Sequence, residues 1–187
     1  MQVNPMNGED TIRSAKVLIV DDEFYTRKVI RTLLLSLGVT NVYDEADGAH
    51  GLDAIVTIDP DVVILDWEMA GMKGAEFVRH VRSPGKFKYA NVPIIMLTGH
   101  GEHWRVVEAM RLGVHEFLLK PVSGHALHAR LASVLRKPRP MVRHGDYDGA
   151  ERRKTRTNAA KLDTLALRLD AGRPEVDRAR RHMIFIN

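Results

Sequence analysis

Four short apolar runs of the chain each lead directly into a polar or charged residue. They are Val17–Val20 before Asp21 and Asp22, Val62–Leu65 before Asp66, Ile94–Leu97 before Thr98, and His115–Leu119 before Lys120. Runs of this length and composition are typical of strands buried on both faces of a parallel sheet. A fifth, edge strand is predicted around residues 42–46.

Between these runs, apolar residues recur at helical spacing, which predicts a helix after every strand. The predicted helices cover residues 24–37, 48–58, 74–82, 102–112 and 123–135. In the first of them, Val29 and Ile30 are expected to face the core, with Arg27 and Arg31 opposite. Strict alternation with right-handed crossovers predicts an α/β fold, a doubly wound five-stranded parallel sheet with helices on both faces.

The 187 residues suffice for one ordinary domain and an appendage. We expect a flexible N-terminus over 1–14, a domain over 15–136 and a linker over 137–157. The domain should end at Lys137-Pro138-Arg139-Pro140, because two prolines in three residues cannot continue a helix. Residues 158–187 complete a basic tail in which 158–171 could form one further helix.

The net charge of +4 is unevenly distributed. Residues 1–136 hold 15 Lys and Arg against 17 Asp and Glu, whereas residues 137–187 hold 13 against 7. The basic character therefore belongs to the tail. The chain has no cysteine, which excludes thiolate chemistry, and no apolar run long enough to span a bilayer. Because residues 1–14 also lack an apolar targeting segment, we expect a cytoplasmic protein without a membrane partner.

The polar residues that follow the strands are the candidates for chemistry. Because the carboxyl ends of parallel strands open on one edge of a sheet, these side chains should converge there, namely Asp21, Asp22, Asp66, Thr98 and Lys120. Three clustered carboxylates repel one another and need a cation to stay ionised together. A hard divalent ion such as Mg²⁺ suits them and favours phosphate oxygens as further ligands. The sequence therefore predicts a pocket that holds a phosphoryl group.

Five motifs occupy matching strand ends in a fixed order. They are Val20-Asp21-Asp22-Glu23, Glu45-Ala46-Asp47-Gly48, Asp66 with Met69 and Gly74 behind it, Thr98-Gly99, and Lys120-Pro121. In this order they closely resemble the receiver domain of two-component response regulators, of which the single-domain chemotaxis regulators are the simplest. The resemblance covers residues 15–136 and implies a flavodoxin-like sheet with strand order 2-1-3-4-5.

The resemblance also implies a role for each pocket residue. Asp66 would be the aspartate that becomes phosphorylated, and Lys120 would pair with a phosphoryl oxygen. Thr98 would hydrogen-bond another oxygen and shift towards it, after which the ring of Phe117 would turn inward. Phosphoryl transfer needs an in-line nucleophile and positive charge around the equatorial oxygens, and this set of residues suits both requirements.

The implied metal site holds Mg²⁺ through Asp21, Asp22, Asp66 and the main-chain carbonyl of Glu68. Glu68 and His100 also stand two residues after Asp66 and Thr98, where side chains overhang the pocket and, in the family, tune the lifetime of the phosphoryl group.

The chain departs from the family pattern at two positions of the loop after Asp66. The family usually has proline after Met69 and aspartate before Gly74, whereas this chain has Ala70 and Lys73. These changes could loosen the loop and alter its charge, although neither residue belongs to the inferred pocket.

The resemblance implies a histidine kinase or histidine phosphotransfer protein as the donor of the phosphoryl group. The protein would be a signalling phosphoacceptor and not an enzyme that turns over a separate substrate. Because residues 137–187 are too few for a winged-helix output domain, output is expected through a downstream protein bound to the 102–135 surface. Trp104 on that surface could anchor the partner.

Other readings of the chain stay open at this point. A DNA- or RNA-binding regulator could act through the basic tail and would bind with a steep salt dependence, but no helix-turn-helix or aromatic–basic pattern favours it.

A phosphatase would need a second acid beside its nucleophile, a position that Glu68 could fill. Residues 147–153 partly match a Tyr-x-Gly-Pro-Glu/Asp-Arg-Arg element of some stand-alone receivers, and a solvated basic linker explains them equally well.

Overall fold

The computed structural model describes residues 8–83, 90–99, 103–136, 141–144 and 147–150. All of them belong to one unit, Met1–Glu151. No helix in these ranges is long and apolar enough to cross a membrane.

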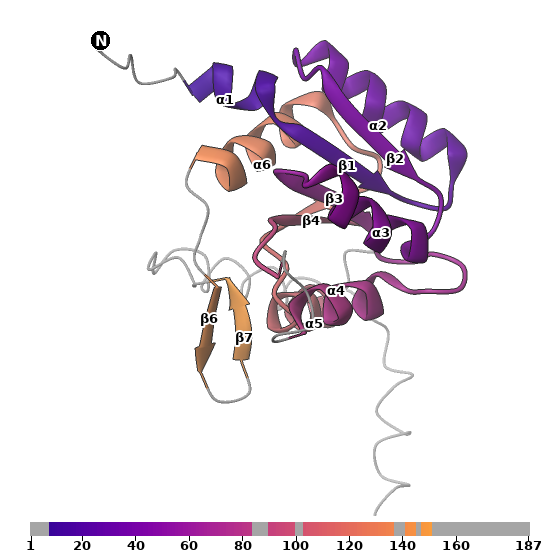
Figure 1. The fold of residues 1–187 in the computed structure, drawn as a ribbon, viewed down its shortest axis with the longest axis vertical. Coiled ribbons are helices and arrows are strands. Elements are labelled where there is room, and N and C mark those ends of the chain that lie inside the picture. The colour runs from indigo at the N-terminus through magenta and orange to yellow at the C-terminus, as the bar shows by residue number, and fades with distance from the viewer. Residues whose placement is uncertain (1–7, 84–89, 100–102, 137–140, 145–146, 151–187) are drawn as a thin grey trace, which may run out of the picture. The chain divides into compact units, whose positions relative to one another are not determined.

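A five-stranded parallel sheet forms the centre of the fold (Figure 1). Its strands are β1 (Lys16–Val20), β2 (Asn41–Glu45), β3 (Val62–Asp66), β4 (Ile94–Thr98) and β5 (Glu116–Leu119). They are arranged in the order β2-β1-β3-β4-β5, and every neighbouring pair is parallel. The predicted fold class and the predicted strand order are therefore confirmed.

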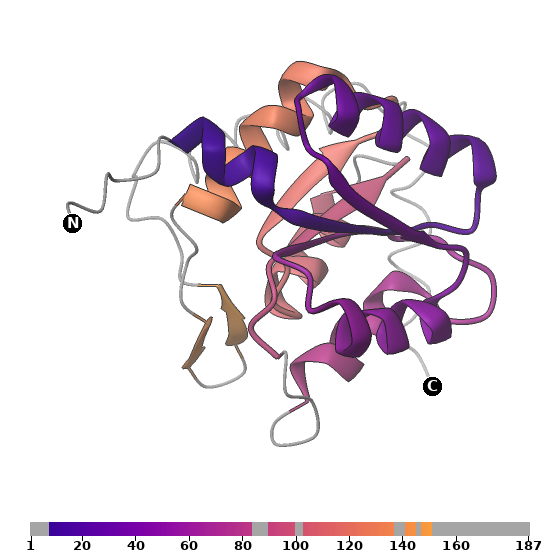
Figure 2. The same ribbon diagram turned by 45° about the horizontal axis from the view of Figure 1, so that its top comes forward.

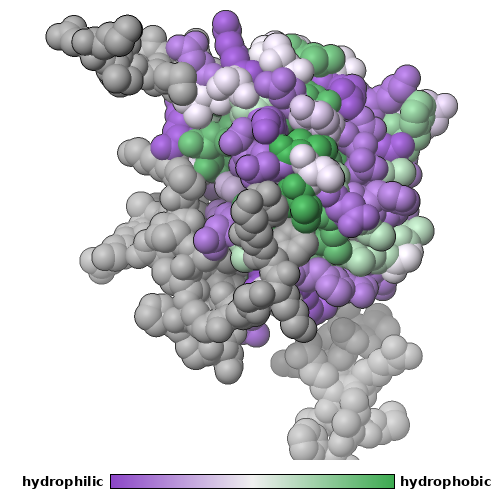
Figure 3. Space-filling model, viewed as in Figure 1, coloured by the Kyte–Doolittle hydropathy of each residue, from purple (hydrophilic) through white to green (hydrophobic). Residues whose placement is uncertain are grey.

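Helices cover both faces of this sheet (Figure 2). The crossover helices are α2 (Phe24–Ser36), α3 (Gly48–Ile58), α4 (Gly74–Arg82) and α5 (His103–Arg111), and α6 (Gly124–Arg136) follows β5. One apolar cluster joins the sheet to α2 and α6, and a second joins its other face to α3, α4 and α5. Hydrophilic residues dominate the surface seen in Figure 3, and most apolar residues of the strands are buried in these two clusters.

The side chains of each strand alternate between the two clusters. In β3, Val62 and Ile64 contribute to the first cluster, and Val63 and Leu65 contribute to the second. All five residues of β3 are buried, and the first four, Val62–Leu65, are apolar. The one polar side chain of this strand, that of Asp66, therefore occurs where the strand ends.

Helix α2 differs in one respect from the predicted pattern. Ile30 and Leu34 are buried, but Val29, which was expected to face the core, is 53% exposed. The prediction for Val29 is wrong because the helix packs through the narrower stripe that contains positions 30 and 34. With this stripe facing the core, the side chains of Arg27 and Arg31 point towards β2 and not into solvent.

The segment predicted as a flexible N-terminus, residues 1–14, contains a short helix. Residues Gly8–Ser14 form the helix α1, and Ile12 is 2% exposed within the first apolar cluster. This helix has seven residues and one deeply buried side chain, so its apolar periodicity is too short to be recognised in a sequence.

The segment predicted as a linker contains an antiparallel hairpin. Its strands are β6 (Met141–His144) and β7 (Tyr147–Ala150), which pair with His144 opposite Tyr147. The partial tail motif at 147–153 therefore begins in a strand.

Several predictions fall outside the described residues. They are the helix over 158–171, the rest of the basic tail and the position of His100. The side chain of Trp104 is also outside the described part of the structure.

Candidate functional site

The strand ends that carry polar residues lie side by side at the carboxyl edge of the sheet. Val20 of β1 is paired with Leu65 of β3, so that Asp21, which follows β1, and Asp66, the last residue of β3, are neighbours. Asp66 itself is paired with Leu97 of β4, immediately before Thr98. Residues that are far apart in the sequence are therefore brought together by the register of three parallel strands.

Three carboxylates form a compact group at this edge. Oxygen atoms of Asp21, Asp22 and Asp66 all lie within 4.8 Å of one another. Asp21 and Asp66 are buried, with 0% and 5% of their surfaces exposed, whereas Asp22 is exposed. A cluster of hard oxygen ligands that opens to solvent on one side fits a divalent cation such as Mg²⁺.

Lys120 is bonded to both of the buried acids. Its Nζ lies 2.9 Å from Oδ2 of Asp21 and 3.0 Å from Oδ1 of Asp66. Burial by itself would lower the pKa of Lys120, but the hydrogen bonds to the two carboxylates outweigh burial and raise it. The lysine is therefore a fixed positive charge within the acidic group.

The ionised form of Asp66 is destabilised by its surroundings. Burial raises its pKa from 3.8 to about 6, against the opposing effect of Lys120, and the charge of Asp21 adds to the rise. Above this pH the carboxylate is ionised and can act as a nucleophile. Its ionisation nevertheless costs free energy, which a bound cation would offset.

The loop after β3 is held against the acids at both of its ends. The amide of Ala70 donates to Oδ2 of Asp22 at 2.8 Å, and the amide of Gly74 donates to the carbonyl of Trp67 at 3.0 Å. A Cβ at Gly74 would lie 2.3 Å from the carbonyl oxygen of Asp66, so no other residue fits without a shift of the backbone. The alanine at position 70 thus contributes a hydrogen bond to the loop that a proline, lacking an N–H, cannot make.

Thr98 and Phe117 are on the same face of the sheet. Met96 and Phe117 are paired across β4 and β5, and Thr98 follows Met96 by two residues, so alternation directs it to the same side. Thr98 is 4% exposed, and Phe117 is partly buried against the second apolar cluster. The carbonyl of Thr98 also accepts a hydrogen bond from the amide of Lys120 at 2.9 Å. The predicted movement of Thr98 and Phe117 remains a prediction.

Glu68 lies in the loop after β3, and its side chain is exposed. The metal-binding role predicted for its main-chain carbonyl, and any role of its carboxylate, remain predictions.

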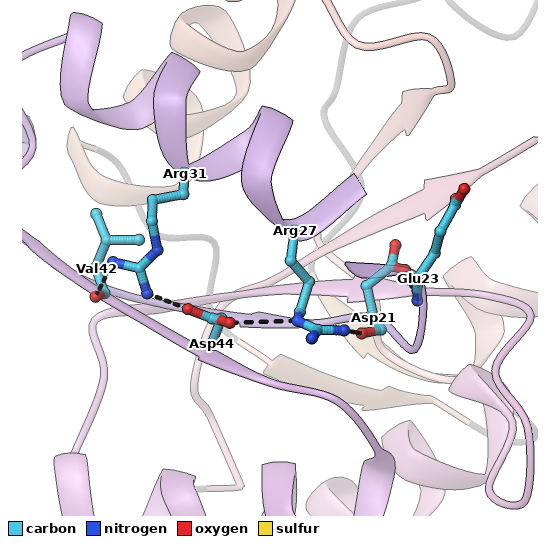
Figure 4. A network of polar contacts seen from close by, with 6 residues as sticks. All are labelled: Asp21, Glu23, Arg27, Arg31, Val42 and Asp44. Atoms are coloured by element: carbon cyan, nitrogen blue, oxygen red, sulfur yellow. Dashed lines mark hydrogen bonds and ion pairs between the residues drawn. The ribbon is translucent and has the colours of Figure 1, made fainter. Parts of the chain in front are cut away.

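The sequence interpretation missed a polar network beside the acids. Arg27 and Arg31 were placed on the solvent side of their helix, but both reach Asp44 of β2 (Figure 4). Their spacing of four residues was the available signal, because it places both side chains on one side of the helix. The partner could not be identified from the sequence, since Asp44 belongs to another element.

Comparison with known proteins places these observations in a wider context. The response regulator receiver domain matches residues 17–132, a range that contains all the predicted pocket residues. The chemotaxis protein CheY-3 of Vibrio cholerae is 30% identical over 125 residues, which are 67% of this chain and 95% of the relative. A CheY homolog of Campylobacter jejuni is 36% identical over 121 residues, which are 64% of this chain and 92% of that protein. The solved structure of Vibrio cholerae CheY4, crystallised at low pH, has a TM-score of 0.60 and 34% identity, covering 65% of this chain and 99% of that one.

Proposed function

This chain belongs to the response regulator receiver family and is a two-component response regulator, and we propose that it accepts a phosphoryl group on Asp66. The observation that carries the proposal is the ion pairing of Lys120 with both Asp21 and Asp66 within a cluster of three acids. This arrangement puts a nucleophile, a positive charge and oxygen ligands for a cation into one pocket.

The proposed reaction is a transfer from a phosphohistidine of a histidine kinase or a histidine phosphotransfer protein. A carboxylate oxygen of Asp66 forms a bond to phosphorus as the phosphorus–nitrogen bond breaks, and the imidazole leaves with the electron pair. Lys120 stabilises one phosphoryl oxygen, and the hydroxyl of Thr98 donates to another. Because the pKa of Asp66 is about 6, the nucleophile is ionised at neutral pH even without a cation.

Asp21, Asp22 and Asp66 would hold Mg²⁺ together with the main-chain carbonyl of Glu68. When bound, this ion supplies positive charge to the phosphoryl oxygens and relieves the repulsion among the carboxylates. The chain's own contribution is to hold two of these carboxylates buried at fixed strand ends.

Phosphorylation replaces a monoanion by a dianion beside Thr98 and Lys120. Both side chains are drawn towards the new charge, Phe117 turns into the space that Thr98 leaves, and the 102–135 surface changes its packing. Couplings of this kind amount to about 1–3 kcal/mol, which is enough to switch the affinity for a downstream protein.

The acceptor is tested by labelling with a small phosphodonor, acetyl phosphate, in the presence of Mg²⁺. The wild type and the variant Asp53→Asn, which makes the same chemical change at an exposed residue of α3, should both form an acyl phosphate. Asp66→Asn should form none, and full labelling of this variant would overturn the proposal.

A second variant tests the coupling to output. Lys120→Ala should keep the fold and should still accept some label, but its affinity for the downstream partner should no longer depend on phosphorylation. The same phosphorylation-dependent gain in affinity as in the wild type would contradict the role given to Lys120.

Nucleic-acid binding gains no support from the comparisons. The matched residues, 17–132, end before the basic tail on which that reading depends. The phosphatase reading likewise has no specific observation in its favour, and the absence of turnover of a generic phosphate ester would dispose of it.

A further inference from the structure

Two arginines of α2 are bound by one carboxylate of β2 (Figure 4). Arg27 donates through Nε to Oδ2 of Asp44 at 3.2 Å, and Arg31 pairs through Nη2 with Oδ1 of the same residue. Arg31 also donates to the carbonyl of Val42 at 2.9 Å. Partial burial would raise the pKa of Asp44, but the two arginines together hold it below its ordinary value. Asp44 is therefore a permanent negative charge between two guanidinium groups.

Only one of these two arginines also contacts the acid pocket. Nη1 of Arg27 donates to the main-chain carbonyl of Asp21 at 2.7 Å. The side chain of Arg27 is 13% exposed, compared with 38% for Arg31, so its guanidinium is held between Asp44 and the strand end. Arg27 thus connects an edge strand to the first acid of the pocket.

Asp21 is held by a donor at each of its oxygens. Besides the bond from Arg27 to its carbonyl, Oδ1 accepts from the amide of Glu23 at 2.8 Å and Oδ2 accepts from Lys120 at 2.9 Å. The peptide unit that contains this carbonyl also contains the nitrogen of Asp22. A group that holds this peptide plane therefore holds the two Cα atoms from which the side chains of Asp21 and Asp22 leave the backbone, and so restricts where both carboxylates can lie.

We propose that Arg27 is a positioning residue of the acid pocket, which holds the Asp21–Asp22 peptide in the orientation that a divalent cation requires. The inference rests on the proposed cation site and adds to it a residue that does not touch the ion. Asp44 holds the guanidinium in place, and Arg27 in turn holds the strand end. Groups that orient metal ligands in this way typically change metal affinity about 10- to 100-fold when they are removed.

Removal of Arg27 should lower the affinity for Mg²⁺, which is the opposite of what charge repulsion alone would cause. Arg27 is a cation close to a cation site, so electrostatic repulsion alone would make its removal strengthen Mg²⁺ binding. If positioning dominates, its removal weakens binding, because the carboxylates must be ordered at the time of binding. The direction of the change therefore separates the two effects.

Arg31 provides the matched control. Arg27→Met and Arg31→Met each remove one positive charge from the same helix and one contact with Asp44. Only the first removes the bond to Asp21, and only the second removes the bond to the carbonyl of Val42. A third variant, Arg27→Lys, keeps the charge but lacks the planar group that reaches two acceptors in different directions.

The first measurement is the affinity for Mg²⁺ alone, followed by the fluorescence of the full chain, in which Trp67 directly follows Asp66. We expect Arg27→Met to lower the affinity by about tenfold and Arg27→Lys to restore little of it. Arg31→Met should change it by less than about twofold. An unchanged or higher affinity in Arg27→Met, or equal losses in Arg27→Met and Arg31→Met, would overturn the proposal.

The second measurement needs no metal ion. The NMR shift of the amide nitrogen of Asp22 reports on hydrogen bonding at the carbonyl of Asp21, which belongs to the same peptide unit. In the metal-free protein this shift should move in Arg27→Met and Arg27→Lys, and stay in place in Arg31→Met. If the wild type shows no saturable response to Mg²⁺, the proposed cation site fails, and the NMR shift still decides whether Arg27 orients the acids. An unmoved shift in Arg27→Met would overturn the positioning role.

Discussion

Replacing Asp66 by asparagine should stabilise the metal-free protein at neutral and alkaline pH. Burial raises the pKa of this carboxyl from 3.8 to about 6, so the ionised form is less favourable in the folded chain than in the unfolded chain. The stability contributed by protonated Asp66 is complete below pH 3.8 and is lost as the pH rises through about 6. Asparagine has the same shape and never ionises, so the variant avoids this loss.

The magnitude follows from the size of the pKa rise. A rise from 3.8 to about 6 corresponds to about 3 kcal/mol at full ionisation. Water that reaches the open side of the pocket screens part of this effect, so a gain of about 1–2 kcal/mol is expected near pH 8. At about pH 5 Asp66 is mostly protonated in the folded chain but mostly ionised in the unfolded chain. About half of the stability difference between variant and wild type should therefore remain at that pH. Lys120 keeps Asp21 as a partner in the variant, so no buried cation is left unpaired.

The assay is urea unfolding followed by tryptophan fluorescence, with EDTA present, at about pH 5 and about pH 8. The variant Asp53→Asn serves as the control for the chemical change alone. Adding Mg²⁺ should reverse the order of stability, because a ligand at 100 times its dissociation constant stabilises the wild type by about 2.7 kcal/mol. A variant that is no more stable than the wild type near pH 8, or a difference that does not shrink towards pH 5, would refute the reasoning.

Three further substitutions have defined outcomes. Gly74→Ala should lower the free energy of unfolding by about 1–3 kcal/mol and slow phosphorylation, because its Cβ would lie 2.3 Å from the carbonyl of Asp66; wild-type values in urea unfolding and labelling would contradict this. Arg82→Met should cost about 2–4 kcal/mol in urea unfolding, because its buried guanidinium donates to three main-chain carbonyls, and a loss below about 1 kcal/mol would be inconsistent with that role. Ala70→Pro should lower the free energy of unfolding by up to about 1 kcal/mol, because the bond from its amide to Asp22 is lost, and the variant should still bind Mg²⁺. Loss of Mg²⁺ binding would contradict this and show that the amide is essential.

The sheet and the position of the pocket could be predicted because both depend on features that recur along one chain direction. Val62–Leu65 is apolar without interruption, which identifies a strand buried on both faces, and the next residue is necessarily at its carboxyl end. The same holds for the runs before Asp21, Thr98 and Lys120. Parallel pairing then brings these residues together without any information about side-chain contacts.

What could not be predicted depends on pairing between elements or on very few residues. Arg27 lies beside exposed positions of its helix, and its acceptors on other elements, Asp44 and the carbonyl of Asp21, explain why it turns inward. The helix that buries Ile12 is too short to show a period. The amide of Ala70 was overlooked for another reason, since a pattern of residue types describes side chains and not main-chain donors.

Lys120 pairs with Asp21 and with Asp66 at once. A divalent ion that binds there would consequently displace the ammonium group of Lys120 from the two carboxylates. The side chain proposed to grip a phosphoryl oxygen would come free only when another cation has taken over the carboxylates. This arrangement favours one order of binding, in which the cation precedes the phosphoryl group.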